Sequence, residues 1–213
     1  MRFVFVHGWG FDAGFWNPLR DAMGHPESVA IDLGFQGAPQ LDIARDEPYI
    51  AVGHSFGVQW LLHHCADHSW LGLVSINGFA KFTKADDFTH GTDPRLLRAM
   101  IAGFKRRPNV VFRDFMALCG ERNAVGGALN TAPLLEGLQA LNDWDERPAL
   151  AECGVPVLAL AGFADAVVSE NMSRSTYAGH HLMFKTGGNH LLARTDPQWC
   201  GDKILDFAKD LKT

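Results

Sequence analysis

The sequence Gly53-His54-Ser55-Phe56-Gly57 holds a serine between two glycines, the G-x-S-x-G spacing of a nucleophile elbow. A serine hydroxyl is a weak nucleophile until a neighbouring base removes its proton. In a sharp strand-to-helix turn, glycines on both sides of the serine avoid clashes with the adjacent strand and helix. We therefore interpret Ser55 as a nucleophile. The alternative is a small residue that suits a tight turn.

Two further residues are candidates for the base and the acid of a catalytic triad. His190 lies on the glycine-rich loop TGGNHLL and can act as the general base. Asp165, in LAGFADAVV, can orient the imidazole and stabilise its charged form. The chain order Ser55, Asp165, His190 is the order expected on an α/β sheet with a nucleophile elbow. Alternatives stay open for the base at His180 and His181, and for the acid at Asp143, Asp145 and Asp196.

An oxyanion hole requires two backbone N–H donors that face the developing negative charge. One donor is expected from Phe56, the residue that follows the nucleophile. The other is expected from Trp9 in the HGWG segment, which follows the first apolar run of the chain. The Trp9 indole would then form a wall of the acyl pocket, and the alternative is an ordinary core tryptophan.

These residues need a sheet to position them. Short apolar runs bounded by turn residues predict strands at 2–6, 28–34, 48–55, 71–78, 155–162 and 181–188. Helical patterns lie between them, which favours a mostly parallel sheet of about six strands, flanked by helices. The segment from 33 to 48 has room for two helical turns at most, so we expect a trimmed α/β fold. Each triad candidate follows the carboxyl end of a predicted strand, where open α/β sheets bind ligands.

The middle of the chain has a different pattern. The segments PRLLRAMIAGFKRR, NVVFRDFMALCG and APLLEGLQALNDW each show helical spacing, and no strand pattern separates them. We expect residues 80–147 to form a helical cap over one end of the sheet. Residues 1–79 and 148–213 would then form the core.

The segments FVHGWGFDAGFW, VGHSFG, LAGFADAVV and GGNHLL together resemble the α/β-hydrolase superfamily. More narrowly, HGWG and FRDFMALCG resemble the pimeloyl-[acyl-carrier-protein] methyl ester esterases of biotin synthesis, whose cap carries a similar run over the acyl chain. The resemblance implies a carboxylic ester hydrolase that needs no cofactor and no metal. It also implies substrate-binding roles for Trp9, Phe115, Met116, Leu118 and Cys119, for which plain packing of the cap on the core is the alternative.

The same resemblance implies an acyl carrier protein as a partner. The esterases grip that partner through arginines of the cap, and Asp114 stands about where one of these arginines is expected. Nearby cations are candidates to replace it, namely Arg98, Lys105, Arg106, Arg107 and Arg113.

Composition excludes several other classes of protein. A net charge of -5 gives no basic surface for nucleic acid. No run approaches the roughly 18 apolar residues of a membrane span, and the apolar start of the chain is too short for a signal peptide. Four separated cysteines indicate reduced thiols. We therefore expect a cytoplasmic monomer that binds neither nucleic acid nor membrane.

The predicted activity is hydrolysis of a small or acyl-chain ester through an acyl-enzyme, and the resemblance suggests a pimeloyl-acyl-carrier-protein methyl ester as substrate. The same triad would also serve an acyl thioesterase or a C–C bond hydrolase. A hypothesis from another class is a non-catalytic binding module on a hydrolase fold. Such proteins tend to lose a triad member, whereas this chain offers all three.

Overall fold

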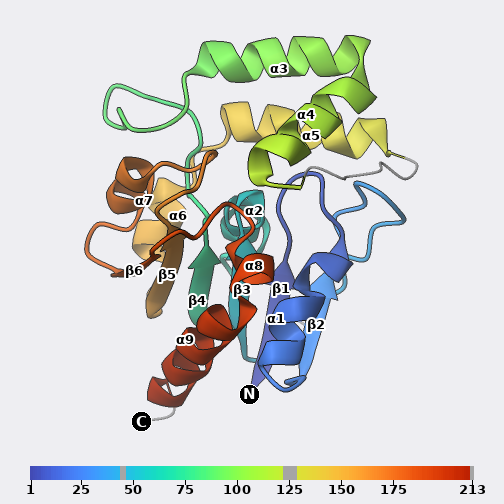
Figure 1. Cartoon of the computed structure of the whole chain (residues 1–213). Helices are drawn as coiled ribbons and strands as arrows, with labels where there is room; N and C mark the ends of the chain where they lie inside the picture. Colours follow the sequence, from blue (N-terminus) through green and yellow to red (C-terminus); the bar gives the residue numbers. More distant parts are fainter. Residues whose placement is uncertain (44–46, 122–128, 212–213) are drawn as a thin grey trace.

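The computed structural model describes residues 1–43, 47–121 and 129–211. Its centre is a six-stranded sheet with the order β2-β1-β3-β4-β5-β6, in which every neighbouring pair is parallel (Figure 1). The strands are β1 (Arg2–Val6), β2 (Ser28–Ile31), β3 (Tyr49–His54), β4 (Trp70–Ile76), β5 (Val157–Gly162) and β6 (His181–Lys185). The prediction of a six-stranded α/β sheet is confirmed. Its inner strands are covered on both faces, which is why they occur in the sequence as continuous apolar runs.

Helices follow most of the strands. Within the described residues they are η1 (Ala13–Trp16, a 3₁₀ turn), α1 (Asn17–Ala22), α2 (Phe56–Cys65), α3 (Pro94–Arg106), α4 (Pro108–Cys119), α5 (Thr131–Asp143), α6 (Arg147–Glu152), α7 (Glu170–Thr176), α8 (Leu192–Thr195) and α9 (Pro197–Asp210). Three of them begin with a proline, at Pro94, Pro108 and Pro197. Proline suits this position because its missing N–H would have no partner within the helix.

The strand order reverses between β1 and β3. The chain passes from β1 to β2 in one direction across the sheet and from β3 to β4 in the other. Right-handed crossovers therefore place α1 and α2 on opposite faces of the sheet. Helix α9 packs beside α1, and its Phe207 contacts the sheet at Gly72 of β4. The carboxyl ends of β1 and β3 thus border the crevice in which sheets of this type bind ligands.

Helices α3, α4 and α5 lie over the carboxyl end of the sheet, and we call them the cap helices (Figure 1). Helix α3 packs against both α4 and α5. Its Leu97 and Phe104 are buried, as are Leu134 and Leu138 of α5. The three helices fall within the residues predicted as a cap, while the domain boundaries at 80 and 147 stay a prediction.

Charged side chains connect the two ends of the cap segment. The Lys81 ammonium lies 3.2 Å from a carboxylate oxygen of Asp145, and the two residues also form an isolated backbone bridge. Arg147 holds both carboxylate oxygens of Asp145 and also contacts Asp87. Because Lys81 follows β4 and Asp145 follows α5, this network closes the base of the cap.

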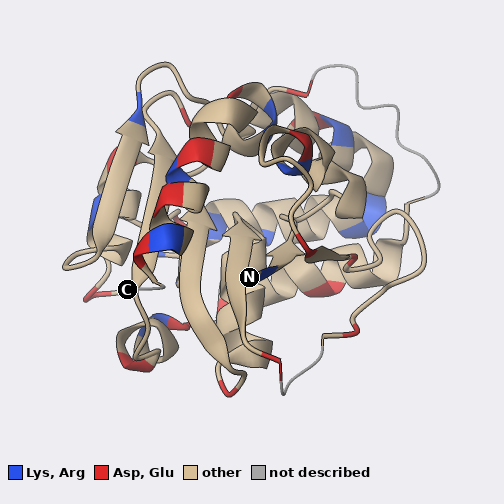
Figure 2. Cartoon of the chain, turned by 90° about the horizontal axis from the view of Figure 1, so that it is seen from below, with Lys and Arg blue, Asp and Glu red and all other residues tan. Residues whose placement is uncertain are grey.

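Charge is concentrated away from the sheet. Figure 2 shows lysines, arginines and acidic residues on the helices and loops, and β3, β4 and β5 contain none of these residues. Across the described ranges, no helix combines the length and the apolar character that crossing a membrane requires.

Candidate active site

Ser55 lies in a strained turn between β3 and α2. Its backbone has φ 53° and ψ −124°, a region that costs a non-glycine residue about 1–3 kcal/mol and persists only where the surroundings enforce it. The Ser55 N–H donates to the carbonyl of Ile76 in β4, which helps to hold the turn. At Gly57 a Cβ atom would lie 2.1 Å from the carbonyl oxygen of Val6. The glycine therefore allows α2 to start directly against β1, and the turn presents the serine above the sheet.

Ser55, His190 and Asp165 form one hydrogen-bonded chain. The Nε2 atom of His190 lies 3.1 Å from the Ser55 hydroxyl oxygen, and its Nδ1 atom lies 2.8 Å from a carboxylate oxygen of Asp165. The other carboxylate oxygen accepts the backbone N–H groups of Val167 and Val168 at 2.7 and 2.9 Å. These two bonds fix the orientation of the carboxylate, so that its free oxygen faces the imidazole.

The alternative bases and acids lie elsewhere. His181 is exposed at the start of β6, and His180 directly precedes it. The alternative acids have other partners: Asp143 accepts from Asn142, Asp145 pairs with Arg147, and Asp196 pairs with Lys185. Of the candidates that the sequence offered, the geometry therefore brings together Asp165, His190 and Ser55.

The two expected oxyanion donors lie at the ends of neighbouring strands. Phe56 is the first residue of α2, where a backbone N–H has no acceptor within the helix. Trp9 follows β1, and in the described part of the chain no backbone carbonyl accepts its N–H. Phe56 follows Ser55 in the sequence, and Trp9 lines the same cavity as Ser55. Both positions are consistent with the predicted oxyanion hole.

The Trp9 indole joins the core to the cap. Its Nε1–H donates to the carbonyl of Leu134 in α5 at 2.7 Å, and its ring is almost fully buried. Gly137 of α5 gives the ring room, because a Cβ there would lie 2.8 Å from it. The ring of Phe115 also meets the indole edge-on, at 5.1 Å between centroids. Trp9 is thus both a wall of the site and a fixed contact beneath the cap helices.

A cavity of about 320 Å³ opens above Ser55. Its walls come from the cap helices and from the loops after β1, β4 and β5. The lining residues are Trp9, Ser55, Phe79, Phe82, Thr92, Leu96, Leu97, Met100, Phe115, Leu118, Leu138, Leu141, Ala166 and Val167. None of these residues carries a charged side chain. The cavity therefore suits an uncharged, apolar group next to the serine.

The cap contributes to this cavity in a way that differs partly from the expectation. Phe115 and Leu118 line it, as the resemblance implied, whereas Met116 and Cys119 do not. Side chains three residues apart in a helix share one face, whereas each step of one residue turns the direction by about 100°. Phe115 and Leu118 therefore lie on one face of α4, and Met116 and Cys119 lie on another. Met116 instead packs against Gly10 and lines a separate hollow. The substrate-binding role expected for Met116 and Cys119 is therefore not supported by their positions.

Cys119 is the last residue of α4, and its side chain is buried. Burial raises the pKa of its thiol far above the usual value, and the charge of Asp165 adds to the effect. The thiol is therefore held in its neutral form and is not a second nucleophile of the site.

Several wall residues were not foreseen in the sequence. Leu97 and Met100 of α3, and Leu138 and Leu141 of α5, lie at helical spacing of three residues. That spacing identifies an apolar helix face, but it does not say that the face lies over Ser55. Among the residues that the structure describes, no group of three or more His, Cys, Asp or Glu side chains could hold a metal ion.

Comparisons with known sequences give relatives along nearly the whole chain, although no family model matches it. The chain is 26% identical over 241 residues to the biotin biosynthesis bifunctional protein BioHC of Cellvibrio japonicus, covering 99% of this chain and 48% of that protein. It thus spans about half the length of this relative. It is 26% identical over 219 residues to the pimeloyl-[acyl-carrier protein] methyl ester esterase of Stenotrophomonas maltophilia, covering 87% of this chain and 85% of that enzyme.

Solved structures share the architecture at lower identity. A bromoperoxidase from Bacillus anthracis aligns with a TM-score of 0.84 and 17% identity, over 98% of this chain and 91% of that one. An esterase from Exiguobacterium antarcticum aligns with a TM-score of 0.79 and 14% identity, over 100% and 92% of the two chains. Such likeness shows a fold and leaves the chemistry to the site.

The chain therefore has the α/β-hydrolase fold that its sequence predicted, a parallel six-stranded sheet flanked by helices. In sequence it resembles the pimeloyl-[acyl-carrier protein] methyl ester esterase of Stenotrophomonas maltophilia and the biotin biosynthesis protein of Cellvibrio japonicus, which confirms the narrower resemblance. The Stenotrophomonas maltophilia relative is a carboxylic ester hydrolase by name, in agreement with the enzyme class predicted from the sequence.

Proposed function

We propose that this chain is a serine hydrolase of carboxylic esters in which Ser55, His190 and Asp165 act as a catalytic triad. The observation that carries the proposal is the chain of hydrogen-bond distances, 3.1 and 2.8 Å, at the floor of an apolar cavity. A nucleophile, a base and an acid in this arrangement are the constellation that activates a serine.

The first half of the reaction forms an acyl-enzyme. The Ser55 oxygen attacks the ester carbonyl carbon while His190 Nε2 takes the hydroxyl proton, and Asp165 stabilises the imidazolium. The backbone N–H groups of Trp9 and Phe56 receive the oxyanion. When the tetrahedral intermediate collapses, the carbon–oxygen bond to the alcohol breaks and the imidazolium returns its proton to that alcohol.

The second half releases the acid. A water molecule gives a proton to His190 and attacks the acyl carbon, which forms a second tetrahedral intermediate at the same two N–H donors. The bond to Ser55 then breaks, and the serine oxygen recovers the proton from the imidazolium. The enzyme returns to its starting state without any cofactor taking part.

The lining of the cavity supports an uncharged acyl group as the part of the substrate next to Ser55. The side chains around it are apolar or neutral, so a charged group there would lose its hydration without gaining a partner. A methyl ester at the end of an acyl chain fulfils this condition. Together with the names of the relatives, this supports a pimeloyl-acyl-carrier-protein methyl ester as the substrate.

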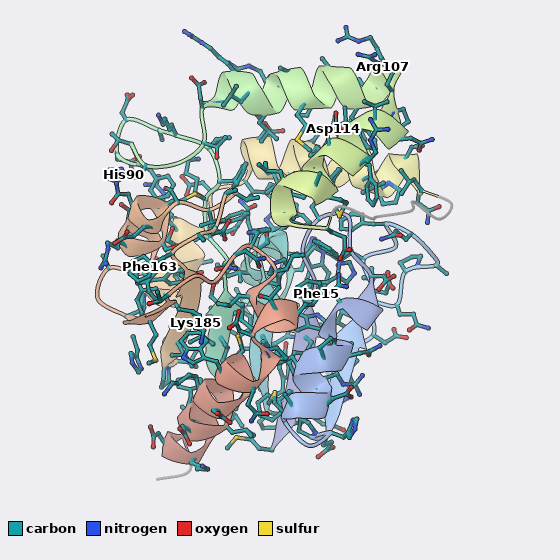
Figure 3. The ribbon with its side chains drawn as sticks, viewed as in Figure 1. Phe15, His90, Arg107, Asp114, Phe163 and Lys185 are labelled. Atoms are coloured by element: carbon teal, nitrogen blue, oxygen red, sulfur yellow. The ribbon has the colours of Figure 1, made fainter. Side chains whose placement is uncertain are left out.

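An acyl carrier protein as partner is supported by the relatives' names and by cations on the cap. Figure 3 labels Arg107 at the turn between α3 and α4, on the outer edge of the cap, and Asp114 on α4. Asp114 forms an ion pair with Arg113 at 3.3 Å. The cations that the sequence offered for this contact are all exposed, namely Arg98, Lys105, Arg106, Arg107 and Arg113. As exposed cations of the cap, they are suited to contact an acidic carrier.

The decisive experiment removes the nucleophile. We expect Ser55→Ala to leave the circular dichroism spectrum and the melting temperature close to those of the wild type, and to lower kcat for p-nitrophenyl butyrate by about 10⁴-fold or more. A fluorophosphonate probe should label the wild type and not this variant. Ser69→Ala, at an exposed serine directly before β4, is the matched control and should behave as the wild type.

The same experiment separates the alternatives. Unchanged hydrolysis in Ser55→Ala would overturn the assignment of Ser55 as the nucleophile. A folded wild type that neither hydrolyses the ester nor reacts with the probe would overturn the proposal in favour of a binding module. A panel that compares butyrate esters with butyryl thioesters assigns the preferred bond. Faster turnover of the thioesters would move the function to an acyl thioesterase with the same triad.

A further inference from the structure

Asn77 occupies the junction of three segments that build the site. It follows β4, is 1% exposed, and has φ 48°, a left-handed conformation that asparagine tolerates better than most residues. Its side-chain nitrogen donates to the carbonyl oxygens of Asn189 and His190 at 2.8 and 3.0 Å. Its side-chain oxygen accepts the backbone N–H of Gly162 at 2.8 Å. The amide orientation follows from these partners, because the carbonyls require donors and the N–H requires an acceptor.

The three bonds join the loop of the base to the strand that leads to the acid. Gly162 ends β5, three residues before Asp165. At this point the two loops are in close contact, because a Cβ on Gly162 would lie 2.2 Å from the carbonyl oxygen of Gly188. Asn77 thus holds, with one side chain, the main chain on both sides of the bond between His190 and Asp165.

His54 supplies a second donor to the same carbonyl. Its Nε2 lies 2.9 Å from the carbonyl oxygen of His190, and its ring is fully buried. Burial lowers the pKa of His54 well below its usual value, and the neighbouring His190 adds to the effect, so the ring is neutral and Nε2 carries its hydrogen. The main-chain oxygen of His190 therefore receives two donors from two different strand ends, β3 and β4.

We propose that Asn77 is a positioning residue, whose amide fixes the main chain of His190 so that the imidazole stays within hydrogen-bond distance of Ser55. This inference rests on the proposed function, because it gives Asn77 its effect through the general base. Asn77 does not line the cavity, and its side-chain hydrogen bonds go to Asn189, His190 and Gly162 and not to Ser55. Displacement of a catalytic group by about 1 Å can cost on the order of 100-fold in rate. Loss of the hydrogen bonds of the Asn77 amide should therefore lower kcat.

The first test removes the side-chain hydrogen bonds of Asn77 and keeps its backbone conformation. Glycine accepts a positive φ without strain, so Asn77→Gly deletes all three hydrogen bonds while it allows the same turn. We expect kcat for p-nitrophenyl butyrate to fall by on the order of 10- to 100-fold with KM within about twofold of the wild type. The rate of fluorophosphonate labelling of Ser55 should fall in parallel, because it depends on the same base.

The second test keeps the shape of the side chain at position 77 and replaces its NH₂ group by an oxygen atom. In Asn77→Asp one oxygen can still accept from Gly162, while the other faces the two carbonyl oxygens. The ionised carboxylate repels them, whereas the protonated carboxyl can donate to one of them. We therefore expect the ratio of kcat in this variant to kcat in the wild type to rise as the pH falls. Taking the ratio removes the pH dependence that the two proteins have in common.

A matched control tests whether any buried hydrogen bond at this place has the same effect. Tyr177 donates to the hydroxyl of Ser75 in β4 at 2.6 Å, two residues before Asn77, and both side chains are buried. Tyr177→Phe removes this bond without touching the loop of His190. We expect it to lower the melting temperature and to leave kcat within about twofold of the wild type.

The outcomes separate this inference from the proposed function. A wild type without hydrolysis or labelling would overturn the function itself. With an active wild type, a folded Asn77→Gly variant with wild-type kcat would overturn the positioning role, as would a pH-independent ratio for Asn77→Asp. Unfolding of both Asn77 variants, or an equal loss of kcat in Tyr177→Phe, would assign the residue a purely structural role instead.

Discussion

The carboxylate of Asp165 and the imidazole of His190 face each other at 2.8 Å, with both side chains 1% exposed. The other carboxylate oxygen is held by two backbone N–H groups, so the pair has little freedom to rearrange. A contact of this kind fixes which imidazole nitrogen carries the hydrogen, and therefore which one is free to accept the serine proton.

This relationship predicts the effect of Asp165→Asn. The amide oxygen of the variant can replace the carboxylate oxygen that accepts from Val167 and Val168, so the loop should keep its shape. The amide nitrogen would then donate to Nδ1 of His190 and leave the hydrogen on Nε2, the wrong tautomer for a base. We expect kcat at neutral pH to fall by about 10⁴-fold, measured with p-nitrophenyl butyrate.

Asp196→Asn is the control for this prediction, because Asp196 was an alternative acid and pairs with Lys185 at 3.5 Å. It should keep wild-type kcat. If Asp196→Asn loses activity while Asp165→Asn retains it, the assignment of the acid is reversed.

The neutral lining of the cavity predicts discrimination against a charged acyl group. We compare p-nitrophenyl pentanoate with mono-p-nitrophenyl glutarate, whose acyl chain has the same length and ends in a carboxylate. Burial of the carboxylate without a partner should cost about 3 kcal/mol, so kcat/KM should favour the neutral ester by about 100-fold. Met100→Lys places a cation at a half-buried position on the cavity face of α3 and should reduce the preference for the neutral ester in kcat/KM. Equal kcat/KM values in the wild type would contradict an uncharged acyl site.

The close approach of α2 to β1 predicts a large effect of Gly57→Ala on stability. The added Cβ would lie 2.1 Å from the backbone oxygen of Val6, which cannot move without disturbing the sheet. We expect the free energy of unfolding to fall by about 3 kcal/mol or more, measured by denaturant titration. Gly37→Ala is the control, because nothing lies within 4 Å of its added atom, and it should change stability by less than about 0.5 kcal/mol. Similar losses of stability in the two variants would show that the close approach of residue 57 to the Val6 oxygen does not determine the effect.

The ion network at the base of the cap predicts a dependence of stability on pH. The hydrogen bond from Arg147 lowers the pKa of Asp145 to about 2, burial opposes the shift, and Lys81 adds to it. Because the pKa is lower in the folded state than the ordinary value near 4, the contribution of Asp145 is present above about pH 4. It is lost as the pH falls towards 2.

Asp145→Asn should therefore lower the free energy of unfolding at pH 7 by about 1 kcal/mol, a value that allows for screening of these partly exposed groups. The difference in free energy of unfolding between the variant and the wild type should shrink between pH 4 and pH 2.5. Thermal unfolding at several pH values across that range measures it. Asp143→Asn, at an exposed neighbour outside this network, is the control and should change the free energy of unfolding at pH 7 by less than about 0.5 kcal/mol. A difference that stays constant with pH would mean that the charge of Asp145 does not stabilise the cap.

The local features of this chain were predictable from the sequence. The strands appear as apolar runs, because strands of a parallel sheet are covered on both faces, and the strained turn at Ser55 appears as two glycines at fixed spacing. The amphipathic pattern after Ser55 identified α2. These signals depend on neighbours within a few positions of the chain, so the linear sequence contains them in full.

The site itself depends on contacts between distant segments. The sequence offered three histidines for the base and four aspartates for the acid, and the meeting of the loops after β5 and β6 brings His190 and Asp165 together. The rotation of α4 about its axis decides that Phe115, and not Met116, faces the cavity. No motif marks Asn77, because its role arises from bonds to residues 85, 112 and 113 positions away. Periodicity and turn chemistry thus determine the elements, whereas hydrogen-bond distances between loops exist only once the sheet has brought their strand ends side by side.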